Sequence, residues 1–119
     1  MDEVLARLEA ESAIRRLVAR YCDAVNRRDA DAAGQLFAAD CRITIAGGPE
    51  RLGRELHTEG MRQTFAAFAF LRQQCDSGLI DVAGDAATAR LSVFEKRLHL
   101  IVNKGVVGGI PAAAGRMAP

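Results

Sequence analysis

Polar and apolar side chains alternate near the end of the chain, in a segment that is typical of a β-strand. Glu95 and His99 fall on one face of that strand. The apolar residues Leu91 and Val93 fall on the same face, because successive side chains of a strand point to opposite sides. A carboxylate and an imidazole can both accept a proton in general base catalysis. The pattern therefore predicts an apolar pocket whose lining becomes polar toward one end of this strand.

Two other interpretations of this strand stay open. Charged side chains are common on exposed edge strands, where they discourage unwanted strand pairing, so Glu95 and His99 can also mark such an edge. A bulge near Phe94 would exchange the two faces and place Lys96 inside instead.

Tyr21 is the single tyrosine of the chain and lies within a predicted amphipathic helix. Apolar residues recur there at intervals of three and four, which places them on one helix face: Ile14, Leu17, Val18, Tyr21, Cys22 and Val25. A tyrosine hydroxyl in a pocket can donate a hydrogen bond to a developing oxyanion. The alternative is an ordinary buried aromatic residue whose hydroxyl meets a polar neighbour.

The remaining pattern predicts the elements that would position these residues. Residues 3–10 form either a short leading helix or the first turns of the helix over 11–26, and Asp29 or Asp31 caps a second helix that ends near Asp40. A strand over 41–46 and a helix over 54–68 follow. Later predicted elements are a strand over 70–82 that bulges near 76–78, a turn at 83–85 and a partner strand from Ala87 to about Val102.

Several motifs resemble the SnoaL-like branch of the NTF2-like superfamily. They are Ala13-Ile14 through Tyr21, Asp29-Ala30-Asp31 through Leu36-Phe37, Gly53-Arg54-Glu55, and the hairpin pattern over 80–89. The resemblance implies an α+β cone, in which a curved, mostly antiparallel sheet wraps around three helices and encloses an apolar pocket. Glycine and proline near the C-terminus predict that the last strand is truncated or irregular.

The same resemblance implies candidate functional residues. Lyases and isomerases of this superfamily remove a proton with a pocket His or Asp while a tyrosine holds the oxyanion, and Tyr21 falls at the position of that tyrosine. This chain has Asn26 where the dehydratase-like members have Asp, Cys75 where they have His, and Ile45 where the ketosteroid isomerase relatives have Asp. Each replacement removes a proton acceptor. Glu95 is the closest counterpart of an acidic residue of the dehydratases.

Two functions are consistent with these residues. The first is a cofactor-independent lyase, isomerase or cyclase that acts on a small hydrophobic ring compound, with Tyr21 as donor and His99 or Glu95 as base. The second is a non-catalytic ligand-binding or dimerisation domain. The residues predicted to contact the ligand are Asn26, Cys75, Phe37, Phe65 and Val18, in a pocket further lined by Val25, Ile43, Leu91 and Val93.

Length, net charge and cysteine content lead to predictions about domain number, partners and location. The 119 residues predict a single domain over 1–108 with a flexible tail over 109–119. A net charge of +1 without a basic stripe argues against nucleic acid as a partner. Three cysteines without a C-x-x-C pair, and two dispersed histidines, predict no metal site and a cytoplasmic location. We further expect no cofactor, no membrane span, a homodimer formed through the open sheet face, and a solvated His57.

Overall fold

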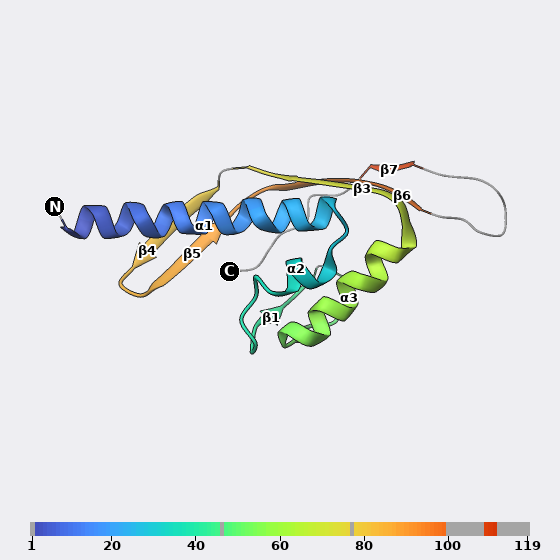
Figure 1. Ribbon diagram of the computed structural model, residues 1–119, viewed down its shortest axis with the longest axis horizontal. Coiled ribbons are helices and arrows are strands. Elements are labelled where there is room, and N and C mark those ends of the chain that lie inside the picture. Colours follow the sequence, from blue (N-terminus) through green and yellow to red (C-terminus); the bar gives the residue numbers. More distant parts are fainter. Residues whose placement is uncertain (1, 46, 77, 100–108, 112–119) are drawn as a thin grey trace.

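The computed structural model describes residues 2–45, 47–76 and 78–99 and the backbone of 109–111; the side chain of His99 lies outside the described part. The helices are α1 (Asp2–Asn26), α2 (Ala30–Gly34) and α3 (Arg54–Ala67). The strands are β1 (Arg42–Ile43), β2 (Arg51–Leu52), β3 (Phe68–Cys75), β4 (Leu79–Ala83), β5 (Ala86–Arg90), β6 (Val93–His99) and β7 (Gly109–Pro111). Figure 1 shows the long α1 lying along the strands, with α2 and α3 beside its C-terminal half.

Helix α1 is continuous, so residues 3–10 form its first turns rather than a separate helix. Its two ends differ in burial. Ala24 and Val25 near the C-terminal end are each 2% exposed, whereas Val4, Leu5 and Leu8 near the N-terminal end are exposed. The C-terminal half of α1 is therefore the part that belongs to the core.

Helix α2 begins where the sequence predicts and ends sooner. The Asp29 side chain accepts a hydrogen bond of 3.0 Å from the backbone N–H of Ala32, which satisfies one of the free donors of the first turn. After Gly34, the backbone N–H groups of Leu36 and Phe37 reach back only three residues, so the chain continues as a turn and not as a helix to Asp40. Phe37 still packs against the core.

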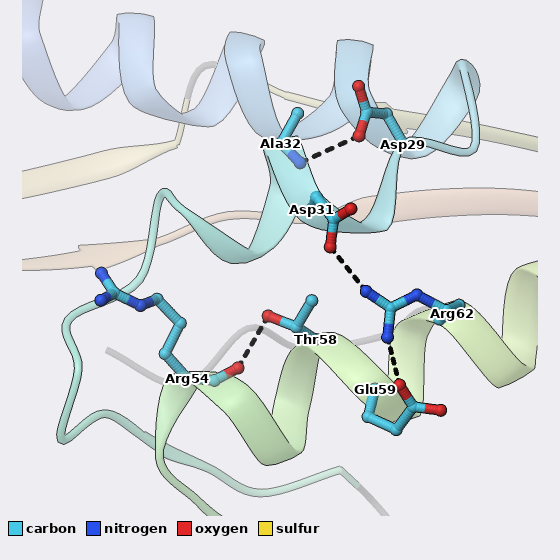
Figure 2. Close-up of polar contacts among 7 residues, drawn as sticks. All are labelled: Asp29, Asp31, Ala32, Arg54, Thr58, Glu59 and Arg62. Carbon is cyan, nitrogen blue, oxygen red and sulfur yellow. Dashed lines mark hydrogen bonds and ion pairs between the residues drawn. The ribbon is translucent and has the colours of Figure 1, made fainter.

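Helices α2 and α3 approach closely because Gly34 has no side chain. A Cβ atom at this position would overlap the Oγ1 atom of Thr58. Figure 2 shows the polar contacts at this junction, where the Arg62 guanidinium bridges Asp31 of α2, at 2.5 Å, and Glu59 of α3. The Thr58 hydroxyl donates to the carbonyl of Arg54 within α3.

Strands β3–β6 form a long, bent antiparallel hairpin. Strand β3 pairs with β6 and β4 pairs with β5, and the β4–β5 turn contains Gly84 with a φ of 61°. Three residues separate β3 from β4, but two separate β5 from β6, so one side of the bend is a residue longer than the other. The predicted bulge over 76–78 includes position 77, which lies outside the described residues. Asp76 and Ser92 join the two sides of this bend through hydrogen bonds of 3.1 Å.

The predicted strand over 41–46 is reduced to Arg42–Ile43, which pairs with the short β2. At the other end of the chain, Gly109–Pro111 pairs with β6 as β7, within the segment predicted to be a flexible tail. Pro111 can be accommodated there because an edge strand leaves one row of N–H groups unpaired. The extent of the tail stays a prediction.

The core forms where the helices meet β3. It consists of Ala24, Val25, Ala30, Ala33, Met61, Phe65, Phe68 and Leu71. All strand pairs in the described part of the chain are antiparallel, so the molecule has the α+β architecture predicted from the sequence.

Candidate functional site

Three aromatic rings from separate segments form a row beside the core. Tyr21 of α1 contacts Phe37, at 5.7 Å between ring centroids, and Phe37 contacts His57 of α3, at 4.8 Å. Both pairs are edge-to-face, with interplanar angles of 86° and 81°, which is a favoured geometry for aromatic pairs. Phe37 thus links the tyrosine predicted to be functional to a histidine.

The expectation that His57 is solvated is wrong, since the residue is only 4% exposed. His57 lies on the buried face of α3 with Met61 and Phe65. Their spacing of four residues is the signal that could have revealed this. Burial, followed by the nearby Arg51 guanidinium, lowers the pKa of His57, so the ring is neutral at neutral pH.

Arg51 connects His57 to the rest of the site. Its Nη1 atom lies 3.3 Å from Nδ1 of His57, and a neutral imidazole nitrogen can accept a hydrogen bond from a guanidinium. The guanidinium packs on α3 at Gly60, where a Cβ atom would lie 2.5 Å from Nη1. The glycine within the predicted helix therefore makes room for Arg51.

The Tyr21 hydroxyl is held in its neutral form. Burial, followed by the ionisable groups of Cys22, Glu95 and Cys75, raises the pKa of Tyr21 to about 12, against the opposing effect of Arg51. These groups come from α1, β6, β3 and β2. No described residue forms a hydrogen bond with this hydroxyl, which is therefore a free donor within the described part of the chain.

Glu95 lies on the inner face of β6, as the alternation predicts. Its side chain is 16% exposed and pairs with Arg97 at 2.6 Å, whereas Phe94 and Lys96 are exposed. The second carboxylate oxygen accepts a bond of 3.4 Å from Nε2 of Gln73. The Oε1 atom of Gln73 is buried and has no hydrogen-bond partner among the described residues, so this part of the chain offers an acceptor as well as a donor.

Asn26 and Cys75 are both engaged in contacts with other parts of the protein. The Asn26 amide donates to the Gln73 carbonyl at 2.9 Å and accepts from the Gln73 N–H at 2.6 Å. The Cys75 sulfur lies 2.7 Å from that of Cys22. Burial, the hydrogen bond with Cys22, and the charges of Cys22 and Asp76 raise the pKa of Cys75 to about 12, so Cys75 is a protonated thiol at neutral pH.

The residues predicted to line the apolar pocket differ in burial. Val25, Phe65 and Val93 are buried, whereas the half-buried residues are Val18, Phe37, Ile43 and Leu91. A shallow hollow of about 330 Å³ lies elsewhere, and is lined by Arg28, Ala30, Arg62, Phe65 and Ala66. His99 pairs through its backbone with Phe68, and its predicted role falls on a side chain outside the described part.

Among the described residues, no three His, Cys, Asp or Glu side chains gather in a way that could hold a metal ion. In the same part of the chain, no helix combines the length and apolar character that crossing a bilayer requires.

The sequence profile of the SnoaL-like domain matches residues 6–103, and the chain belongs to this family. No curated protein sequence matches the chain significantly.

Solved structures share the fold. A proposed scytalone dehydratase from Novosphingobium aromaticivorans has a TM-score of 0.73 at 19% identity, over 93% of this chain and 72% of that one. A proposed aromatic ring hydroxylase from the same organism has a TM-score of 0.74 at 21% identity, over 87% and 73%. An NTF2-like protein with a cystatin-like fold, also from N. aromaticivorans, has a TM-score of 0.69 at 22% identity, over 98% and 82%.

Proposed function

We propose that this chain is a cofactor-independent proton-transfer enzyme of the lyase, isomerase or cyclase type. Its substrate would be a small hydrophobic ring compound with a keto or hydroxyl oxygen. The observation that carries the proposal is the half-buried Tyr21 hydroxyl, which has no hydrogen-bond partner among the described residues and is held neutral by a pKa raised to about 12. A protonated hydroxyl at the edge of the core can donate a hydrogen bond to a substrate oxygen.

The neighbouring residues suggest a role for each group. Tyr21 would donate to the carbonyl oxygen of the substrate, and Arg51 would stabilise negative charge as it develops there. Glu95 would remove a proton from the adjacent carbon, and the free Oε1 of Gln73 would accept a bond from a substrate hydroxyl. His99, on the same strand as Glu95, is the other candidate base. The proposed scytalone dehydratase with the same fold carries a name from this class of reaction.

Exchange of substrate protons for deuterium tests the proposal directly. In deuterated buffer, the parent protein should catalyse exchange next to the carbonyl of a cyclic hydroxy ketone, as followed by NMR. Tyr21→Phe and Glu95→Gln should each reduce the exchange rate about 100-fold or more, the loss expected for an oxyanion donor or a general base. His99→Gln tests the second base.

Glu9→Gln is the matched control, because Glu9 is exposed on the first half of α1 and undergoes the same chemical change as Glu95. It should exchange protons at the parent rate. If the parent binds the ketones but produces no exchange between about pH 5 and pH 9, the catalytic proposal is wrong.

A non-catalytic ligand-binding or dimerisation domain is the second candidate. It is favoured by Asn26, whose amide is occupied by the Gln73 backbone, and by Cys75, which stays protonated. Calorimetry with the same ketones would then show binding without turnover. Phe70 and Phe94, 45% and 64% exposed on the outer face of the sheet, would form the interface of a homodimer, which sedimentation velocity on Phe94→Ser would test.

A further inference from the structure

Two cysteines that are distant in sequence meet between α1 and β3. The Sγ atoms of Cys22 and Cys75, 53 residues apart, are separated by 2.7 Å. A disulfide bond is about 2.05 Å long, so a movement of less than about 1 Å would bring the two sulfurs to bonding distance. The third cysteine, Cys41, precedes β1 and has no sulfur contact within the described part of the chain.

Hydrogen bonds beside this pair hold the end of α1 against β3. Asn26 lies one helical turn after Cys22 and binds the backbone of Gln73, two residues before Cys75. Arg28 donates to the carbonyl of Ala69 at 2.5 Å, further along β3. The end of α1 is therefore fixed along β3, and the two sulfurs face each other without a change in fold.

We propose that Cys22 and Cys75 are a reversible oxidation site, where hydroperoxides or low-molecular-weight disulfides convert the two thiols into a disulfide that links α1 to β3. This site is independent of the proposed proton transfer. Because Cys22 is next to Tyr21, the new bond would also fix the helix turn that carries the Tyr21 hydroxyl.

The chemistry balances with a hydroperoxide as oxidant. The Cys22 thiolate attacks the peroxide, its sulfur becomes a sulfenic acid, and an alcohol leaves. The Cys75 sulfur then attacks the sulfenic sulfur, forms the S–S bond, and releases water as its proton is transferred to the departing oxygen. Two electrons pass from the sulfurs to the peroxide. With oxidised glutathione, the Cys22 thiolate forms a mixed disulfide and releases one glutathione thiol, and Cys75 then displaces the second, so the same two electrons reduce the glutathione disulfide.

Mass spectrometry of the full chain tests the site. After mild hydrogen peroxide or oxidised glutathione, the intact protein should lose about 2 Da, corresponding to two hydrogens, and dithiothreitol should restore the original mass. Trypsin should release one linked species that joins residues 21–27 to 73–90, since Arg20, Arg27, Arg72 and Arg90 border these peptides. Cys41, in peptide 29–42, should remain free for alkylation.

Thermal unfolding gives a second measurement. The crosslink should raise the Tm of the oxidised protein by about 5 °C or more, since it closes a long loop. Cys41→Ser is the matched control and should show the same mass loss and shift, whereas Cys22→Ser should show neither. The parent protein alone can overturn the proposal, so the test does not depend on the folding of a variant. The proposal is wrong if the parent forms disulfides through Cys41 or between chains. It is also wrong if oxidation stops at stable sulfenic or sulfinic acids.

Discussion

At the scale of single residues, Asn26 connects α1 to the backbone of β3. Both ends of its amide are used, one as donor to the Gln73 carbonyl and one as acceptor from the Gln73 N–H. A carboxylate at this position could accept but could not donate. The amide that removes a proton acceptor from the family pattern is therefore well suited to holding the helix against the strand.

Asn26→Asp should destabilise the protein by about 1–3 kcal/mol, because the Gln73 carbonyl would lose its donor and face a negative charge. Chemical denaturation at neutral pH measures the loss. Gln74→Glu is the matched control, since Gln74 is an exposed amide on the same strand, and it should change stability by less than about 0.5 kcal/mol. Equal effects of the two substitutions would show that the Asn26 contacts contribute little.

Tyr21 can be titrated without interference, because the chain has one tyrosine and no tryptophan. Ultraviolet absorbance should show ionisation with a pKa of about 12 instead of 10. The pKa is raised by folding, so the stability it contributes is complete below pH 10 and is lost as the pH rises toward 12. Glu95→Gln should lower the pKa by removing a negative charge. Titration of the folded parent near pH 10 would mean that the hydroxyl is exposed.

At the scale of elements, two glycine residues allow neighbouring segments to approach each other closely. Gly34 allows α2 to lie against Thr58 of α3, and Gly60 leaves room on α3 for the guanidinium of Arg51. The two positions differ in how they would respond to a methyl group. Arg51 is long and can move, whereas Thr58 is short and β-branched and bonds to the carbonyl of Arg54.

Gly34→Ala should therefore destabilise the protein by about 1–3 kcal/mol, the usual cost of overpacking, although alanine is intrinsically the better helix former. Thermal unfolding measures this effect. Combining Gly34→Ala with Thr58→Ala should recover part of the loss, because neighbouring substitutions couple. Additive losses in the double variant would contradict a steric origin.

At the scale of the whole molecule, the bent hairpin and the helices form one structure in which β6 is paired on both sides. Strand β3 pairs with β6 from Phe68 to Cys75, with one register shift at Ala69, whereas β7 contributes the three residues Gly109–Pro111. Neither Gly109 nor Pro111 offers a large apolar side chain to a core. Most of the stability of the sheet should therefore come from the pairing between β3 and β6.

Truncation after residue 108 tests the contribution of the C-terminal segment. We expect Tm to fall by about 5 °C or less, corresponding to a loss on the order of 1 kcal/mol. Differential scanning calorimetry of the parent and truncated chains measures the shift. A truncated chain that no longer unfolds cooperatively would show that β7 completes the sheet and that the flexible-tail prediction is wrong.

Features that depend on local periodicity could be predicted from the sequence. Spacing of three and four residues identified the helices, and alternation placed Glu95 on the face of Val93 that turns inward. The extents of α2 and β1 were overestimated, because apolar residues such as Leu36 are equally compatible with a helix or with the turn that follows it.

Contacts between side chains that are far apart in the sequence could not be predicted in this way. Asn26 binds Gln73 across 47 residues, and Cys22 meets Cys75 across 53. His57 illustrates the same limit, because its spacing with Met61 reveals a helix face but not that Phe37 and Arg51 cover it. Periodicity reports which face of an element is buried, whereas the partner on that face depends on how the chain folds back on itself, which no local pattern encodes.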